Sequence, residues 1–302
     1  MITGTQRRNG DATERTALVL ATVLLASLPL LGGTASAQAG NRTLKNTSRI
    51  AYHDGPVMTG SMNVYFIWYG CWTCPGSNYS DTEYLLVGFV GSLGGSAYAR
   101  ILTTYPEPPS GTAPSGGIAY SGAAYDAAYS HGAALTMTDV EDVIGDMILG
   151  SQLPFDQRGL YIVLASPDVA LPGLEVRTCH YHGQAEVAGA RVTYGALNNP
   201  RRLIPGMCGP MASDAQSPND NWVADTFVSM LAHEINGIVT NPTGLGWYDR
   251  YGLEAPDKCA GTYGPTYTTA NGARANLNFG GHDYLIPQNW VNVGRGYCGL
   301  QQ

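Results

Sequence analysis

The feature of this sequence that most suggests chemistry is the pair His233-Glu234, within the segment MLAHEINGIVTNPTGLGWYD at residues 230–249. The helix of a zinc hydrolase typically carries H-E-x-x-H, in which two histidines one turn apart bind zinc and the glutamate activates a water molecule. Here Gly237 stands where the second histidine is expected. Three alternatives follow: a metal site that has lost a ligand, a site that takes this ligand from elsewhere in the chain, or a helix that never bound metal.

A second group of histidines occurs in the segment TCHYHG. His180 and His182 are two residues apart, so on a strand they point to the same face, and this spacing lets two imidazoles share a metal ion. The alternative is a pair of exposed strand histidines. His53 and His282 are each followed by aspartate. Because adjacent residues on a strand do not converge, we interpret these two as turn residues.

Further carboxylates follow the His-Glu segment at Asp249, Glu254 and Asp257, where they could complete a metal site. The sequence contains no G-x-S-x-G nucleophile elbow, no P-loop and no dinucleotide fingerprint. Its formal net charge is −7, and no basic stripe is present. Nucleic acid is therefore excluded as the expected partner, because few cations are available to neutralise phosphates.

The helix that must position His233 is predicted over residues 221–240, NWVADTFVSMLAHEINGIVT. Its apolar residues recur mostly at intervals of three and four, and Asn219 or Asp220 can cap its start. The strong apolar character of this helix means that a polar pair within it needs partners, since burying unpaired polar groups costs several kcal/mol.

Strands and helices alternate in the first half of the chain. Buried strands are predicted at 62–69 and 159–165, and helices at 81–93 and 138–150. In the second helix, Thr138 and Glu141 fit a capping box, and Gly150 ends the helix. This alternation predicts an α/β fold, with α+β as the alternative, in which helices pack on a mixed central sheet.

The remaining segments give weaker signals. Residues 95–135 are rich in Gly, Ser, Ala, Pro and Tyr, and we predict two short strands separated by turns. Further short strands are predicted at 178–185 and 192–197. Beyond Pro242 the chain is predicted to form loops and short strands, a loop-rich C-terminal part.

The N-terminus has the features of a secretory signal peptide. Three arginines precede an uncharged run over residues 17–31, and Ala35 and Ala37 then form an A-x-A cleavage site. This run is shorter than the roughly 20 residues that a membrane span needs. We therefore predict a secreted, extracellular protein without a membrane anchor. The predicted organisation is a signal peptide at 1–37, a flexible lead-in at 38–50 and a single domain at 51–302.

The six cysteines are even in number, which in an exported protein favours disulfides over free thiols. Many pairings are open to six cysteines. The order along the chain suggests Cys71 with Cys74, Cys179 with Cys208, and Cys259 with Cys298. The competing interpretation of Cys71 and Cys74 as half of a zinc site lacks a second C-x-x-C or H-x-x-H to complete it.

Six segments together resemble the plant EXORDIUM family, also called the phosphate-induced protein family. They are YHDGPVMTGSMNVYFIWYG (52–70), LPFDQRGLYIVLASPDV (153–169), CHYHG (179–183), LAHEINGIVTNPTGLGWYD (231–249), GLEAPDKCAGTYG (252–264) and HDYLIPQNWVN (282–292). The resemblance covers nearly the whole mature chain. It implies a secreted, cell-wall or apoplast-associated protein, linked in plants to brassinosteroid-responsive growth, without a firmly established enzymatic activity.

The family pattern is similar to H-E-x-x-[EG]-x-x-[TS]-[ND]-P, and it matches this chain at His233, Glu234, Thr240, Asn241 and Pro242. Gly237 stands where many relatives place glutamate. The E-x-x-D-x-C pattern falls on Glu254, Asp257 and Cys259. The C-G-aromatic-H pattern falls on Cys179 and His182, with His180 replacing the glycine.

Two functions remain open, and the sequence alone does not decide whether the protein is an enzyme. The first is a non-catalytic extracellular protein that binds a cell-wall polysaccharide or another extracellular protein through its Tyr and Trp side chains, with Trp247 and Tyr248 as candidate contacts. The second is a zincin-like metallohydrolase built around the 221–240 helix. There His233 and His182 bind zinc, Glu254 or Asp257 completes the ligand shell, and Glu234 activates water.

Overall fold

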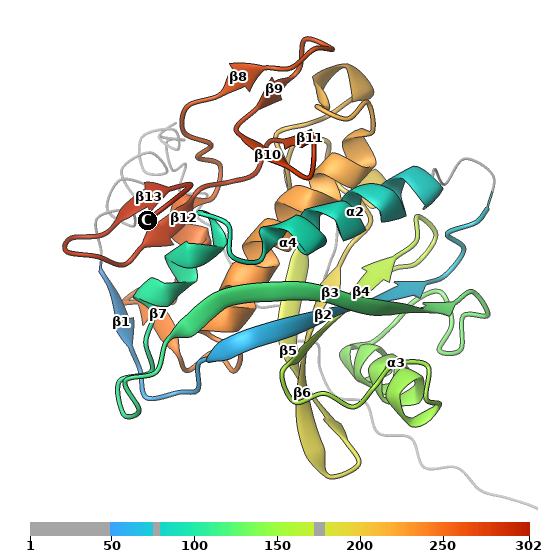
Figure 1. Cartoon of the computed structure of the whole chain (residues 1–302). Coiled ribbons are helices and arrows are strands. Elements are labelled where there is room, and N and C mark those ends of the chain that lie inside the picture. Colours follow the sequence, from blue (N-terminus) through green and yellow to red (C-terminus); the bar gives the residue numbers. More distant parts are fainter. Residues whose placement is uncertain (1–48, 75–78, 172–178) are drawn as a thin grey trace, which may run out of the picture. The chain divides into compact units, whose positions relative to one another are not determined.

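The computed structural model describes residues 49–74, 79–171 and 179–302, all within the compact unit Asn41–Gln302 (Figure 1). The predicted signal peptide and residues 38–48 of the predicted lead-in lie outside these ranges. Ile50, at the end of that lead-in, already belongs to strand β1 (Ile50–Tyr52). Within the described ranges, no helix combines the length and apolar character needed to cross a bilayer.

A five-stranded mixed sheet forms the centre of the described structure. In spatial order its strands are β3 (Pro114–Asp126), β2 (Gly60–Tyr69), β4 (Gly159–Ala165), β6 (Ala190–Leu197) and β5 (His180–Val187). The first four are parallel, and β5 runs antiparallel to β6. The predicted mixed central sheet and α/β class are thus confirmed. The chain steps from β2 outward to β3 and then returns past β2 to β4, so the strand order reverses direction between β2 and β4.

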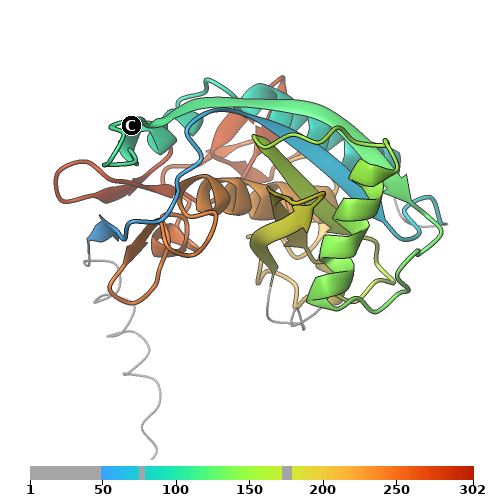
Figure 2. The same cartoon turned by 90° about the horizontal axis from the view of Figure 1, so that it is seen from below.

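Helices cover both faces of this sheet (Figures 1 and 2). One face packs against α2 (Tyr79–Leu93) and α4 (Trp222–Thr240), and the other packs against α3 (Met137–Leu149). Burial on both faces explains why β2 and β4 are continuous apolar runs in the sequence, as is typical of parallel strands.

Helix α3 (Met137–Leu149) has its N-cap two residues earlier than predicted. Thr136 is its N-cap and accepts a hydrogen bond from the amide of Asp139 at 3.1 Å, while the Asp139 carboxylate accepts one from the amide of Thr136 at 2.6 Å. The predicted capping box of Thr138 and Glu141 is therefore wrong. The segment TMTDVE contains two overlapping box patterns, and the chain uses the first.

Helix α4 confirms the prediction over residues 221–240 closely, but its cap is neither Asn219 nor Asp220. Asn221 accepts a hydrogen bond from the amide of Ala224 at 3.1 Å. Every α4 residue except Trp222 and His233 is buried. The polar groups of this helix therefore depend on protein partners, as the sequence indicated.

The prediction of two short strands in residues 95–135 is wrong. Ala99–Thr104 form the 3-10 helix η1, and Pro114–Asp126 form the single long strand β3. The glycines of this segment suggested turns, but in the structure they lie within an edge strand that is irregular. Gly122 has a φ of 143°, and the register with β2 shifts between Val64 and Tyr65.

The C-terminal part is loop-rich, as predicted, and its strands pair two by two. The pairs are β1 with β7 (Trp247–Asp249), β8 (Tyr267–Thr268) with β9 (Arg274–Ala275), β10 (Leu277–Phe279) with β11 (His282–Tyr284), and β12 (Asn289–Val291) with β13 (Tyr297–Gly299). Short 3-10 helices lie at η2 (Pro200–Arg202), η3 (Asp214–Gln216) and η4 (Asp257–Cys259). The cysteines pair in the order suggested by the sequence: Cys71–Cys74, Cys179–Cys208 and Cys259–Cys298.

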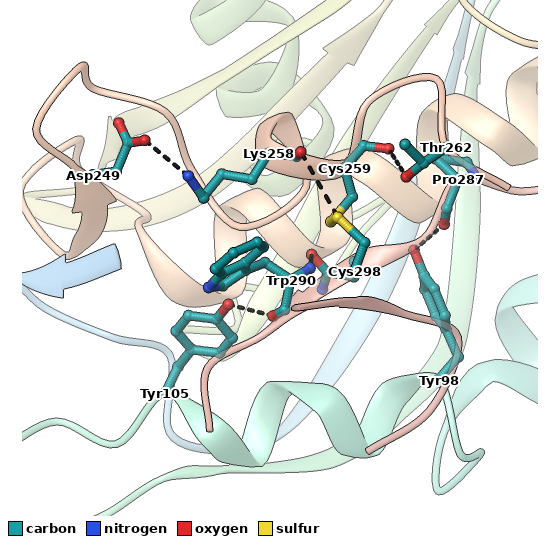
Figure 3. Close-up of a disulfide and its surroundings, with 10 residues drawn as sticks. Tyr98, Tyr105, Asp249, Lys258, Cys259, Thr262, Pro287, Trp290 and Cys298 are labelled. Carbon is teal, nitrogen blue, oxygen red and sulfur yellow. Dashed lines mark hydrogen bonds and ion pairs between the residues drawn. A yellow bond between two sulfur atoms is a disulfide. The ribbon is translucent and has the colours of Figure 1, made fainter. Parts of the chain in front are cut away.

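A buried ion pair lies beside the last of these disulfides (Figure 3). Lys258 Nζ is 3.0 Å from Asp249 Oδ2, and both side chains are fully buried. The same ammonium group lies over the Trp290 ring, 4.7 Å from its centroid. The Tyr105 hydroxyl donates to the Trp290 carbonyl. These contacts connect the loop-rich part to η1 and hold the η4 region, which carries two of the predicted site residues.

Candidate functional site

Helix α4 and strand β5 bring the predicted chemical groups together. Glu234 on α4 is 1 % exposed and lies against the central sheet at Gly195. A Cβ atom at residue 195 would lie 3.0 Å from Glu234 Cγ, tighter than an ordinary contact. Glycine at this position of β6 therefore makes room for the buried glutamate.

Both oxygens of Glu234 are occupied by histidines of β5. His180 Nδ1 contacts Glu234 Oε2, and His182 Nδ1 lies 3.2 Å from Glu234 Oε1. The prediction that His180 and His182 share a face of their strand is confirmed. What they share is a carboxylate.

The other predicted ligands lie around this pair. His182 Nε2 is 3.5 Å from Glu254 Oε1 and 3.2 Å from the carbonyl oxygen of Asn241. On α4, His233 Nε2 is 3.1 Å from Asp257 Oδ1, and the rings of His233 and His180 have centroids 4.6 Å apart. We call this group the His–carboxylate cluster; its members are His180, His182, His233, Glu234, Glu254 and Asp257.

Gly237 has a packing explanation within the cluster. A Cβ atom at this position would lie 2.7 Å from Glu254 Oε2 and 3.5 Å from His182 Cε1. The carboxylate of Glu254 therefore lies beside the helix turn from which an H-E-x-x-H sequence would project its second histidine. A side chain at residue 237 would have to displace it.

Pairing shifts the pKa values of the Glu234 and His182 side chains in opposite directions. Burial alone would raise the pKa of Glu234, but the charges and hydrogen bonds of His180 and His182 outweigh it and hold the pKa well below its ordinary range. Burial would lower the pKa of His182, but hydrogen bonds to Glu234 and Glu254 raise it to about 11. At neutral pH these groups are therefore a carboxylate and an imidazolium.

The second pair behaves in the same way. Burial opposes the charge of His233, yet its hydrogen bond to Asp257 raises the pKa of the imidazole above its ordinary value. The pKa of Asp257 is lowered, because the contact with His233 outweighs its burial. The cluster thus contains two ion pairs, His182 with Glu234 and His233 with Asp257, in a largely buried environment.

The donor atoms of the cluster pair with one another and do not surround one point. Within the described part of the chain, three donors that lie within 4.8 Å of one another occur at His131, Asp139 and Asp142, and not in the cluster. Glu234 is also a weak base in this setting, whereas a general base works best with a pKa near the working pH. The arrangement gives the zincin-like hydrolase hypothesis no support.

The predicted binding residues Trp247 and Tyr248 lie on β7, where they pack against other parts of the chain. The indole nitrogen of Trp247 donates to the carbonyl of Pro106 at 3.0 Å. Tyr248 stacks on His53 with ring centroids 3.6 Å apart. Their role in binding remains a prediction.

A tyrosine-lined pocket of about 520 Å³ lies between α2, strand β3 and the β10–β11 hairpin. Its lining residues are Ser80, Glu83, Tyr84, Val87, Gly88, Ser92, Tyr120, Gly280 and His282. Tyr84 is 65 % exposed and meets His282 edge-on, with ring centroids 5.3 Å apart. His282, which we interpreted as a turn residue, begins strand β11 and supplies one wall of this pocket.

Gly88 is one of the residues that line this pocket. It lies inside a helix, where glycine costs about 1 kcal/mol relative to alanine, yet a Cβ atom here would make only an ordinary contact, at 3.9 Å from the Tyr284 hydroxyl. Internal packing therefore does not require glycine. This pocket was not predicted from the sequence, although a glycine four residues after a tyrosine in a predicted helix was a signal for it.

Comparison with known proteins places these observations in context. Residues 50–290 match the model of the phosphate-induced protein 1 conserved region. The chain is 28 % identical over 288 residues to Protein EXORDIUM-like 3 of Arabidopsis thaliana, covering 84 % of this chain and 83 % of that protein. It is 26 % identical to Protein EXORDIUM of Arabidopsis thaliana (79 % and 85 % covered) and 26 % identical to Protein PHOSPHATE-INDUCED 1 of Nicotiana tabacum (79 % and 84 % covered). No solved structure matches the chain.

Proposed function

This chain belongs to the phosphate-induced protein 1 family, and from that premise we propose that it is a secreted, extracellular protein that binds a neutral cell-wall-type polysaccharide and does not catalyse its turnover. The tyrosine-lined pocket carries this proposal. Ligand sites are typically concave and largely apolar or aromatic, with a few polar groups that fix the ligand's orientation.

The lining of the pocket suits a sugar polymer. Tyr84 and Tyr120 offer aromatic faces, and Ser80, Ser92 and Glu83 offer groups that can hydrogen-bond to hydroxyls. Glu83 is held in place because its Oε1 accepts a hydrogen bond from the Tyr125 hydroxyl at 2.6 Å.

The charge of the lining favours a neutral ligand over an acidic one. Among the lining residues, all within the described ranges, none is lysine or arginine, whereas Glu83 is present. An anionic sugar such as galacturonate would meet this carboxylate without a compensating cation. Neutral glucans and mannans therefore fit the site better than pectate.

Affinity electrophoresis tests this proposal. We expect the purified mature protein to be retarded in gels that contain xyloglucan or another soluble neutral wall polysaccharide, and not in gels with polygalacturonate. The Tyr84→Ala variant should bind at least about tenfold more weakly, a loss of about 1.4 kcal/mol. A reducing-end assay on the same polymers should stay at background.

The matched control is Tyr297→Ala. This tyrosine is 49 % exposed on β13 and lies outside the pocket, so its removal should leave binding unchanged. The proposal fails if no neutral polysaccharide retards the protein, or if the Tyr84 and Tyr297 variants bind alike.

A further inference from the structure

The Cys71–Cys74 disulfide occupies a special position in the sheet. It follows β2 directly through Gly70, at the carboxyl end of that strand. Ser166 and Asp168 follow the neighbouring strand β4 at the same edge. The strand order reverses between β2 and β4, and in open α/β sheets ligands bind outside the carboxyl ends of the strands at such a reversal.

The sulfur atoms differ in accessibility. Cys74 is exposed and Cys71 is half-buried, while Trp72 between them is 3 % exposed. A reagent arriving from solvent therefore meets the residue at position 74 first. Exposed disulfides are also the ones that undergo exchange most readily.

The turn is held in place without the disulfide. The indole nitrogen of Trp72 donates to the carbonyl of Leu164 at 3.0 Å, and its ring packs edge-on against Trp68 at 4.7 Å. The amide of Gly70 donates to the carbonyl of Asp126 at 2.9 Å. Gly70 has a φ of 91°, and a Cβ atom there would clash with Ser166 Oγ at 2.1 Å, so only glycine fits this close approach.

Asp168 fixes the backbone of the turn from the other side. Its carboxylate accepts hydrogen bonds from the Cys71 amide and from the hydroxyls of Tyr129 and Ser166. None of these contacts uses sulfur. Breaking the S–S bond therefore removes none of these contacts directly.

As a structural crosslink, this disulfide contributes the least of the three. The paired cysteines are 3 residues apart in the sequence, against 29 and 39 for the other two pairs. The stabilisation from a disulfide grows with the loop that it closes. A crosslink that constrains so little can open while the fold persists.

From these observations we propose that Cys71–Cys74 is a reversible thiol–disulfide exchange site whose co-reactant is a thiol of an extracellular small molecule or protein. The thiolate of the co-reactant attacks Cys74 Sγ, forming a mixed disulfide, and the Cys71–Cys74 bond breaks with its electron pair leaving on Cys71, which takes a proton from water. A second co-reactant thiolate then attacks the mixed disulfide and releases the Cys74 thiolate, which is protonated in turn. Two co-reactant thiols are thus oxidised to one disulfide, and the protein disulfide is reduced to two thiols.

Stepwise reduction tests the proposal. The mature protein is incubated at increasing concentrations of reduced glutathione or, in a second arm, of a protein dithiol such as reduced thioredoxin. Free thiols are then alkylated and assigned by peptide mass spectrometry. We expect Cys71–Cys74 to be half reduced at a thiol concentration at least about tenfold below that needed for the other two disulfides, while circular dichroism stays unchanged. Reduction in only one arm identifies the source of the thiol.

Single variants test the order of attack. Cys71→Ala leaves a thiol at exposed Cys74, and Cys74→Ala leaves one at half-buried Cys71. With glutathione disulfide, the first variant should form a mixed disulfide at least about tenfold faster, because exchange rate depends on access. Thr73→Ala, which changes an exposed residue of the turn without touching sulfur, should behave as wild type.

Three results would overturn the proposal: reduction of all three disulfides at the same thiol concentration, loss of folded structure when Cys71–Cys74 alone is reduced, or faster modification of Cys71 than of Cys74. The double variant Cys71→Ala/Cys74→Ala separates exchange from polysaccharide binding, since it should lose the first and keep the second.

Discussion

Gly237 and His180 mark where this chain departs from the residues that its family resemblance implies, and both lie in the His–carboxylate cluster. His180 pairs with Glu234, and Gly237 leaves the space that Glu254 fills. The chain thus has a histidine in place of a glycine and a glycine in place of a glutamate around the same buried carboxylates. At the residue scale, the His-Glu pair is a packing and charge arrangement in which each ionised group has a partner.

The protonated His182 imidazole stabilises the fold, and this stabilisation is lost at alkaline pH. Its pKa is raised from 6.5 to about 11 in the folded chain, so its contribution is complete below about pH 6.5 and is lost as pH rises toward 11. The pKa of Glu234 is lowered from its ordinary 4.5, so its contribution is present above that value and is lost as pH falls. We expect the free energy of unfolding to fall between pH 7 and 9.5 by up to about 1.4 kcal/mol per pH unit.

Urea unfolding at pH 5.5, 7.5 and 9.5 checks this prediction. His182→Asn should flatten the alkaline fall, whereas His53→Asn, an exposed histidine outside the cluster, should not. Equal slopes in wild type and His182→Asn would contradict it. Tyrosine ionisation, with an ordinary pKa near 10, begins within this range in every variant, so the difference between the slopes, and not one slope alone, reports the contribution of His182.

Substitutions at two glycines of α2 distinguish an effect on stability from an effect on polysaccharide binding. Gly88 lines the tyrosine-lined pocket, while Gly91 lies outside it with no atom within 4 Å of its would-be Cβ. Each change to alanine should stabilise the fold by about 0.5–1 kcal/mol, because helix propensity improves. Only Gly88→Ala should weaken polysaccharide binding, since it adds a methyl group to a residue that lines the pocket. Thermal unfolding and affinity electrophoresis on both variants check this, and an equal effect on binding would refute the role of Gly88.

At the scale of elements, the η4 region depends on the buried pair of Lys258 and Asp249. Removing the ammonium group leaves a fully buried carboxylate oxygen without its cation, which typically costs about 3–5 kcal/mol. We therefore expect Lys258→Met to lower the free energy of unfolding by that amount in urea titrations. Arg250→Met, which removes an exposed cation nearby, should change it by less than about 0.5 kcal/mol.

If Lys258→Met lowers the free energy of unfolding as little as Arg250→Met does, the ion pair of Lys258 and Asp249 contributes little to stability. Because η4 carries Asp257, the same variant should also loosen the contact of that residue with His233. Histidine NMR signals would report this directly.

Elements with a strong internal pattern were predictable from the sequence. The continuous apolar runs of β2 and β4 and the apolar spacing of α4 each allow one conformation, so their positions were found within a few residues. Strand β3 was not, because its glycines favour turns locally and only pairing with β2 along its length makes it extended. The residues of the His–carboxylate cluster could be singled out in the sequence because histidines and carboxylates are unusual within apolar segments. The tyrosine-lined pocket could not be predicted, because the sequence does not say which face of α2 stays open.

At the scale of the whole molecule, export is the prediction that the proposed function depends on most. If the chain is secreted, the signal peptide should be removed after Ala37, so that the mature protein begins at Gln38. Expression of the full chain with recovery from the culture medium, followed by intact-mass measurement, checks this. A protein that stays in the cells with residues 1–37 attached would contradict both secretion and the extracellular role.

The irregular edge strand of the central sheet affects whether copies of this chain aggregate at high concentration. Among the strands of the described residues, β3 pairs with β2 alone, and its register with β2 shifts twice, between Gly60 and Met62 and between Val64 and Tyr65. Such bulges turn the free backbone groups of an edge strand out of line, so that a second chain cannot extend the sheet. If the proposed polysaccharide binding concentrates the chain on a polymer, this irregular edge opposes strand-by-strand aggregation of neighbouring copies.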